Sequence, residues 1–405
     1  MRIQEHTPVH LTYCLNIHPG ETWAENLTAI RDYATAVKAR VAPDRPFGLG
    51  LRLSRAAAET LRAPAERRRL REELTERGLY AFTINGFPYG RFHGAHVKEQ
   101  VYAPDWRTRE RLEYTCLLAD ILADLLPDGV SGSISTLPGS FKPWIQNTAD
   151  VQSMARQLAA GAKYLAGLRE QTGREVHVGL EPEPFCWLEA TDEVIRFFEG
   201  PLAAACAGAA EHEQVRRHLG ICLDTCHAAL QFESPFAALR RYGAAGLRVS
   251  KIQLSAALEV AMDRGSGSSR LQELAQALAA FCEPVYLHQT RARLADGGQL
   301  AWTDLPEALS ALAQRGDVER VRVHYHVPLF WTGGAPLRST APELTAEFFR
   351  AACAATEHLE IETYTFDVLP AELRAGGVVD SVACEFDWVR HRLAAARELK
   401  LNRAD

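Results

Sequence analysis

The sequence lacks any long hydrophobic run. A membrane-spanning helix requires about eighteen or more consecutive apolar residues, and no segment approaches that length. Residues 1–10 are polar and lack the charged and apolar regions of a signal peptide. We therefore expect a cytoplasmic protein without a membrane span.

Several motifs with well-defined chemistry are also missing. The sequence has no Gly-x-Ser-x-Gly nucleophile elbow, no Gly-Lys-Ser/Thr phosphate loop and no Gly-x-Gly-x-x-Gly turn between a strand and a helix. Serine-hydrolase and nucleotide-driven mechanisms depend on these motifs. Their absence argues against both mechanisms.

The chain has no excess of positive charge. Its 51 acidic residues outnumber its 45 lysines and arginines, which gives a formal net charge of −6. A protein that neutralises the phosphates of a nucleic acid is usually basic. We expect no nucleic-acid partner.

There is no dense cysteine framework either. The nine cysteines are an odd number and lie mostly inside apolar segments, as Cys14 and Cys116 do. Cys222 and Cys226 flank Asp224 without the spacing of a zinc knuckle. We interpret the cysteines as reduced, buried thiols.

What the sequence does contain is an alternation of short apolar runs and longer segments with helical periodicity. The strand candidates are Leu11–Asn16, Phe47–Leu53, Tyr80–Asn85, Gly132–Ser135, Val176–Glu181, Gly220–Asp224, Val249–Leu254, Val321–Val327 and Leu359–Thr365. Between them, Arg107–Leu126 and Val151–Glu170 have the periodicity of helices. This alternation is typical of βα units in a parallel sheet. It predicts a single-domain (β/α)₈ barrel over residues 1–405, with one strand candidate more than the barrel needs.

Two segments interrupt the alternation. Gly86–Trp106 is a long loop after the third strand candidate, and loops of this length in a compact domain are usually functional. Residues 255–320 are predicted to be an insertion in which Tyr286–Thr290 and Gln299–Trp302 form a hairpin. Within it, Gly265–Ser269 is predicted to be a flexible connection.

Polar residues end several of the strand candidates, and the active site of a parallel barrel lies at that end. Glu181 follows an apolar run, and Asp224 ends the next one with His227 three residues later. Carboxylates and imidazoles are ligands for Mn²⁺, Zn²⁺, Fe²⁺, Co²⁺ or Mg²⁺, and a bound cation would polarise a carbonyl or hydroxyl group. The alternative is that Asp224 caps the following helix and His227 is a hydrogen-bonded neighbour.

Later strand candidates add further acids and histidines. Glu360 or Glu362 must point into the barrel if their strand closes it, and Glu362 lies nearer the carboxyl end. Otherwise Glu362 is a solvent-side residue of an edge strand. His324 and His326 lie on one face of their strand. Two such histidines can share a metal, or one can pack while the other forms a hydrogen bond.

These strand ends resemble the xylose isomerase-like barrels, which include sugar epimerases, inosose dehydratases and endonuclease-type phosphodiesterases. More specifically, the chain resembles the EboE-type metabolite traffic proteins. The stretches that carry this resemblance are Thr12–Glu21, Asn85–Gly90, His93–Trp106, Tyr286–Gln289, Val323–Pro328 and Glu362–Pro370. The resemblance spans nearly the whole chain and implies a xylose isomerase-like TIM barrel.

The resemblance also implies a metal centre, because the superfamily holds a divalent cation with a glutamate, an aspartate, a histidine and a final glutamate after separate strands. The predicted ligands are Glu181, Asp224, Gln253, His326 and Glu362. Gln253 stands where the superfamily has histidine. Three alternatives follow. Gln253 is itself a weak ligand, or His326 or His288 takes the place of the missing histidine, or metal binding has been lost. The superfamily's histidine after the aspartate contacts substrate, which gives His227 that role.

We predict a metal-dependent isomerase or epimerase that acts on a small polyol- or sugar-like metabolite. Glu181 or Glu362 would move a proton to or from carbon, and His227 would orient a hydroxyl group. The residues expected to bind the substrate are Asn16, His18, Asn85, Tyr89, Arg91, His93, Lys98 and His324. Arg91 and Lys98 would suit an anionic substrate. A homo-oligomer is left open.

Two other functions fit the same residues. The first is a metabolite-binding or carrier protein without turnover, which Gln253 favours, whereas the three acids in their expected order favour chemistry. The second is a metal-dependent phosphoesterase, which would need several metals and therefore His288, His324 and His326 as ligands. The full three-metal set of the endonuclease branch cannot be placed in this sequence.

Overall fold

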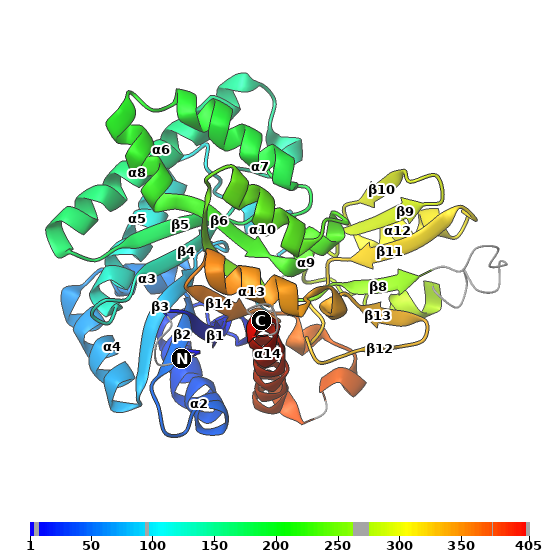
Figure 1. Cartoon of the computed structure of the whole chain (residues 1–405), viewed down its shortest axis with the longest axis horizontal. Helices are drawn as coiled ribbons and strands as arrows, with labels where there is room; N and C mark the ends of the chain where they lie inside the picture. Colours follow the sequence, from blue (N-terminus) through cyan, green and yellow to red (C-terminus); the bar gives the residue numbers. More distant parts are fainter. Residues whose placement is uncertain (4–7, 94–96, 262–274, 375, 402–405) are drawn as a thin grey trace.

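The computed structural model describes residues 1–3, 8–93, 97–261, 275–374 and 376–401. Within these ranges, eight parallel strands form a nearly closed barrel with helices between them (Figure 1). The strands are β1 (His10–Tyr13), β2 (Phe47–Arg52), β3 (Leu79–Asn85), β4 (Gly132–Thr136), β5 (Val176–Leu180), β6 (Leu219–Asp224), β7 (Arg248–Leu254) and β14 (His358–Ile361). Their order is β1-β14-β7-β6-β5-β4-β3-β2, and a parallel bridge between Cys14 and Gly50 joins the two ends. The predicted (β/α)₈ barrel is confirmed.

The strands are buried on both sides because the barrel interior lies on one face and the helices on the other. Every residue of β5 and β6 is buried, for example. Buried polar residues occur on several strands, and Glu360 of β14 lies beside Gln253 of β7 in the register. The interior is therefore packed but contains charged groups.

The helices cover the outside of the barrel. They are α1 (Trp23–Ala29), α2 (Thr35–Val41), α3 (Arg55–Thr60), α4 (Pro64–Glu76), α5 (Arg109–Leu125), α6 (Thr148–Thr172), α7 (Thr191–Phe197), α8 (Ala209–His218), α9 (Thr225–Leu230), α10 (Pro235–Ala244), α12 (Leu305–Leu312), α13 (Ala346–Ala355) and α14 (Gly377–Leu401). The helices predicted over Arg107–Leu126 and Val151–Glu170 are α5 and α6. The second begins earlier than predicted, at Thr148, because the Asn147 side chain accepts hydrogen bonds from the first turn. No helix in the described part of the chain is long and apolar enough to cross a membrane.

The insertion between β7 and α13 forms a second sheet beside the barrel, next to α9 in Figure 1. Its described strands are antiparallel, in the order β10-β9-β11-β8-β13-β12. They are β8 (Leu258–Ala261), β9 (Thr290–Leu294), β10 (Gln299–Trp302), β11 (Val318–Val323), β12 (Gly333–Gly334) and β13 (Leu337–Ser339).

This sheet accounts for the ninth strand candidate. Val321–Val327 was predicted as one strand, but β11 ends at Val323 and pairs with β8 and β9, outside the barrel. The predicted hairpin exists with a shifted first strand, because β9 begins at Thr290 and pairs with β10. The predicted connection Gly265–Ser269 lies outside the described residues. A single domain over residues 1–405 stays a prediction.

Candidate metal centre

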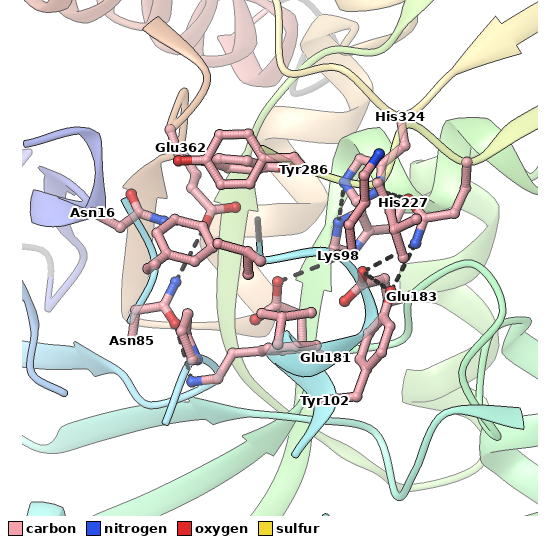
Figure 2. Close-up of a pocket in the computed structure, with 18 residues that line it drawn as sticks. Asn16, Asn85, Lys98, Tyr102, Glu181, Glu183, His227, Tyr286, His324 and Glu362 are labelled. Carbon is pink, nitrogen blue, oxygen red and sulfur yellow. Dashed lines mark hydrogen bonds and ion pairs between the residues drawn. The ribbon is translucent and has the colours of Figure 1, made fainter. Parts of the chain in front are cut away.

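Three buried carboxylates meet at the carboxyl end of the barrel. Glu181 directly follows β5, Asp224 ends β6 and Glu362 directly follows β14. One oxygen from each residue lies within 4.8 Å of the others. Figure 2 shows Glu181 and Glu362 on facing sides of the cavity that they line. Because parallel strands end at the same rim, acids distant in the sequence converge here.

Hydrogen bonds hold two of these carboxylates in place. Glu362 Oε1 accepts from the side-chain amides of Asn16 at 2.8 Å and Asn85 at 3.0 Å. Asp224 Oδ1 accepts from Ser255 Oγ at 2.7 Å and from the backbone amide of His227 at 3.0 Å. Asp224 thus caps α9, as the alternative interpretation predicts, but the cap uses Oδ1 alone.

Two other carboxylate oxygens of the centre have no such partners. Within the described residues, Glu181 Oε2 and Asp224 Oδ2 are buried and accept no hydrogen bond. Unpaired buried acceptors are costly and call for a ligand, a proton or an ordered water. Two buried acidic oxygens without partners, on residues whose carboxylates lie close together, suit a divalent cation.

The electrostatics of the three acids are consistent with this. Burial and the charge of Asp224 raise the pKa of Glu181, and burial and the charges of Glu181 and Asp224 raise the pKa of Glu362. Burial acts to raise the pKa of Asp224 as well, but His227 and His326 lower it below its ordinary value. The three groups repel one another when all are ionised, and a cation between them would relieve that repulsion.

Gln253 lies on β7 in register with Asp224. Its Oε1 accepts a hydrogen bond from Cys222 Sγ at 2.9 Å, while its Nε2 has no partner among the described residues. A half-turn of the carboxamide exchanges these two atoms. In that orientation Nε2 donates to the sulfur and Oε1 is the free atom, so Gln253 can offer an oxygen as a weak neutral ligand.

Three histidines stand beside the acids. His227 Nε2 lies 3.0 Å from His324 Nε2, which lies 3.2 Å from His326 Nε2. His288, in contrast, has both ring nitrogens engaged, one with the backbone oxygen of His324 and the other with Glu283. A phosphoesterase site with His288 as a ligand therefore finds no support in this geometry.

The centre opens into a cavity of about 60 Å³, enough for a few water molecules. The predicted substrate residues that line it are Asn16, Asn85, Lys98, His227 and His324. Aromatic residues also line it, including Phe87, Phe92, Tyr286 and Tyr364. The cavity thus has both polar and apolar lining residues, as small-molecule sites commonly do.

Four other predicted substrate residues do not line the cavity. His18 bonds to the Tyr13 hydroxyl at 3.0 Å and stacks on Tyr33. Tyr89 is half-buried against Tyr114. The backbone amide of His93 donates to Glu21, and Arg91 is exposed. Substrate binding by His18, Tyr89, Arg91 and His93 therefore stays a prediction without a cavity contact.

The sequence reasoning missed a hydrogen-bonded chain at the cavity wall. The Tyr102 hydroxyl donates to Glu183 Oε1 at 2.9 Å and accepts from Gln289 Nε2 at 2.7 Å. Gln289 Oε1 in turn accepts from His324 Nδ1 at 2.6 Å. Burial raises the pKa of Glu183 to about 8. The Glu-Pro-Glu-Pro run after β5 was a signal for Glu183, but nothing local singled out Tyr102 or Gln289.

No protein-family model matches the chain, and no curated protein matches it by sequence. Solved structures do match. A xylose isomerase-like TIM barrel protein from Mycobacterium smegmatis, determined in complex with magnesium, is 9% identical with a TM-score of 0.50, over 96% of this chain and 98% of that one. This chain has the xylose isomerase-like TIM barrel fold.

Two further structures match at lower TM-scores. A xylose isomerase domain protein from Alicyclobacillus acidocaldarius subsp. acidocaldarius is 13% identical, with a TM-score of 0.48, over 96% of this chain and 99% of that one. A D-tagatose 3-epimerase-like protein is 9% identical, with a TM-score of 0.49, over the same shares. At such identities a likeness shows the fold alone.

Proposed function

We propose that this protein is a metal-dependent isomerase or epimerase of a small hydroxylated metabolite. The observation that supports this most is the convergence of Glu181, Asp224 and Glu362, which brings unpaired acidic oxygens together beside a cavity that Glu181 and Glu362 line. Carboxylates around a cation, with room for a small ligand beside them, suit proton transfer next to a carbonyl group.

The three acids would have different tasks. A divalent cation held by Glu181, Asp224 and Glu362, with Gln253 or His326 as a further ligand, would polarise the carbonyl or hydroxyl group of the substrate. Asn16 and Asn85 fix one oxygen of Glu362, which suits a ligand held in one orientation.

Glu181 is better placed than Glu362 to move the proton. Its side chain lines the cavity and keeps one oxygen free of hydrogen bonds within the described part of the chain. A general base must reach the substrate's C–H bond directly or through one water, and a position on the cavity wall suits that role.

The substrate class follows from the walls of the cavity. Hydroxyl groups would meet Asn85, Glu183 and the metal centre, while C–H faces of a polyol or sugar would pack on Phe92 and Tyr286. Lys98 would suit an anionic group at the edge. The cavity admits the reacting end of a substrate, so a longer metabolite would require the covering loops to move.

A carrier protein on the same barrel is the second candidate. The observation that favours it is the contact of Gln253 with Cys222. In the resembled superfamily this position is a histidine that binds the metal, whereas here it is a neutral amide that is already hydrogen-bonded. The EboE-type resemblance would connect such a carrier with metabolite traffic, and that role stays a prediction.

Elemental analysis separates these possibilities. We would measure bound Mn, Fe, Co, Zn and Mg by inductively coupled plasma mass spectrometry in wild type, Glu181→Gln and Asp224→Asn. Glu385→Gln, another buried acid outside the centre, is the matched control. Near-stoichiometric metal in wild type and the control, and at least a tenfold loss in the other two, is the expected result.

Activity is then tested by deuterium uptake from D₂O into ketoses and cyclic polyols, followed by NMR. Uptake that Glu181→Gln abolishes supports the isomerase. Metal binding without uptake by any compound in the panel overturns it in favour of the carrier. If wild type takes up neither Mn²⁺ nor Zn²⁺, the metal-dependent proposal fails.

A further inference from the structure

Another cavity lies at the amino ends of the barrel strands. It is lined by Arg45 and Pro46, directly before β2, and by Gly78 and Leu79, around the start of β3. Because the catalytic rim of a parallel barrel is at the carboxyl ends of its strands, this cavity lies on the other side of the barrel. Its volume is about 740 Å³, compared with about 60 Å³ for the cavity beside the metal centre. Small-molecule sites commonly have volumes of about 300–1,000 Å³, so this cavity has room for a whole ligand.

Much of the cavity wall is apolar and recessed. Leu74 of α4, Leu125 and Leu126 at the end of α5 and Val130 before β4 all line it. Each of these side chains is at most 9% exposed. A ligand that covers them therefore removes apolar surface from water on both sides of the contact. The wall suits the hydrocarbon part of a ligand.

Positive charge accompanies this apolar wall. Arg2, Arg45 and Arg71 line the cavity, and none of their guanidinium groups has an ion pair or hydrogen bond among the described residues. Asp128, the one acid among the lining residues, lies 2.6 Å from Arg174 and is thus already paired. The chain as a whole has a net charge of −6, so this excess of positive charge is local. A local excess of this kind attracts an anion.

A polar pair, His10 and Tyr80, also lines the cavity. His10 Nδ1 lies 2.7 Å from the Tyr80 hydroxyl. Burial and the charge of Arg2 lower the pKa of His10 to about 3, so its ring is neutral at pH 7. Burial raises the pKa of Tyr80, although the charges of Arg2 and Arg45 act to lower it. Two of the arginines therefore act on one neutral phenol, which can form a further hydrogen bond with a ligand.

We propose that this cavity binds a small amphipathic anion, with a carboxylate or phosphate group on a hydrocarbon body. Arg45 and Arg71 would bind the anionic oxygens, because guanidinium groups form charge-assisted hydrogen bonds with carboxylates and phosphates. The hydrocarbon body would pack against Leu74, Leu79 and Leu126. The ligand thus meets both the charge and the apolar wall of the cavity.

The occupant is a free molecule rather than a membrane surface. A protein surface that enters a bilayer presents projecting apolar side chains. None of the large apolar side chains that are exposed in the described ranges lines this cavity. The site is also independent of the proposed isomerase function, because the two cavities share no lining residue.

The test uses the full-length chain and anilinonaphthalene sulfonate, an amphipathic anion whose fluorescence rises in an apolar site. Decanoate and decyl phosphate should each displace this probe, and uncharged decanol should be at least about tenfold less effective. Arg45→Met/Arg71→Met should raise the Kd of the probe at least about tenfold. Both arginines are exposed, so this variant should keep the fold. Arg68→Met, which removes an exposed arginine of α4 that does not line the cavity, should leave the Kd unchanged.

Hydrogen–deuterium exchange then locates the ligand. Decanoate should slow exchange of amides in residues 74–80 and 125–130, and should do so equally in Glu181→Gln. Equal displacement by decanoate and decanol, or an equal Kd in wild type and Arg45→Met/Arg71→Met, overturns the proposal. Binding to phosphatidylglycerol vesicles that this double variant abolishes overturns it in favour of a membrane contact. A dimer in size-exclusion chromatography that the same variant dissociates overturns it in favour of a second copy of the chain.

Discussion

The Nζ atom of Lys251 lies 2.5 Å from Oε2 of Glu360, and both side chains are completely buried inside the barrel. Lys251 Nζ also contacts Thr83 Oγ1 at 3.3 Å. Glu360 lies on β14 two residues before Glu362, so this ion pair lies next to the metal centre along the chain. Lys251 lowers the pKa of Glu181, whereas the charge of Glu360 raises the pKa of Glu181 and of Glu362.

Removing one member of this ion pair should be strongly destabilising. Lys251→Met leaves Glu360 as a buried charge without its partner, and we expect a loss of about 3–5 kcal/mol in the free energy of unfolding. The double variant Lys251→Met/Glu360→Leu replaces the pair with apolar groups and should recover most of that loss. Urea unfolding of the three proteins measures both effects. Equal losses in the single and double variants would contradict this account.

Gly50 makes room for the same pair. A Cβ atom added there would lie 1.9 Å from Glu360 Oε1 and 3.0 Å from the backbone oxygen of Tyr13. We expect Gly50→Ala to cost at least about 1–3 kcal/mol through overpacking. Gly167→Ala is the control, because its Cβ meets nothing within 4 Å on the surface of α6. There alanine should stabilise the protein by about 0.5–1 kcal/mol. Thermal unfolding that ranks the two variants in the opposite order would refute the steric argument.

The barrel could be predicted because each βα unit is encoded locally. Most barrel strands contain a short apolar run, and the helix that follows has its own periodicity, as β3 and α5 show. The ninth candidate, Val321–Val327, could not be assigned from its composition. Its apolar, β-branched residues suit a barrel strand and an insertion strand equally, and only non-local pairing with β8 and β9 decides between them.

The candidate site was predictable where a strand end fixes the side chain. Glu181, Asp224 and Glu362 converge for that reason alone. His18 also follows a strand, but the chain turns into a short helical segment at Leu15–Ile17 that carries it toward Tyr13. Contacts made by long loops, such as that of Tyr102 with Gln289, depend on where the insertion folds back and have no local signal.

Glu385 of α14 should make stability depend on pH. It is completely buried, and burial raises its pKa to about 7 although Thr363 and the Leu329 amide donate to it. The pKa of this carboxyl group is near 4.5 in the unfolded chain. Between pH 4.5 and pH 7 the folded state therefore holds a proton that the unfolded state has lost. Its contribution to stability is therefore greatest below pH 4.5 and declines as pH rises to 7.

Glu385→Gln keeps the hydrogen-bond acceptor and removes the ionisation. The free energy of unfolding of the variant minus that of wild type should therefore increase between pH 5 and pH 8, by up to about 3 kcal/mol. Urea titrations at four pH values measure this difference, in which other titrating groups cancel. Glu72→Gln, an exposed acid on α4, is the control. A difference that stays constant across the range would show that Glu385 is ionised throughout.

The loop after β3 is clamped to the insertion over the cavity. Lys98 Nζ lies 2.6 Å from Asp304 Oδ2, and the Val97 amide donates to the backbone oxygen of Val285 at 2.9 Å. Asp304 is held in turn because its Oδ1 accepts from the amides of His288 and Leu305. A substrate larger than the cavity would require these contacts to open.

Lys98→Met should weaken the clamp without removing any group of the metal centre. The ion pair is partly exposed, so its loss is worth about 0.5–1 kcal/mol, and amides of residues 97–102 should exchange about 2- to 5-fold faster. Hydrogen–deuterium exchange mass spectrometry measures this. Arg109→Met breaks an exposed ion pair with Glu113 on α5 and should leave these amides unchanged. Equal protection in Lys98→Met and wild type would mean that the backbone contact with Val285, and not the ion pair, holds the loop closed.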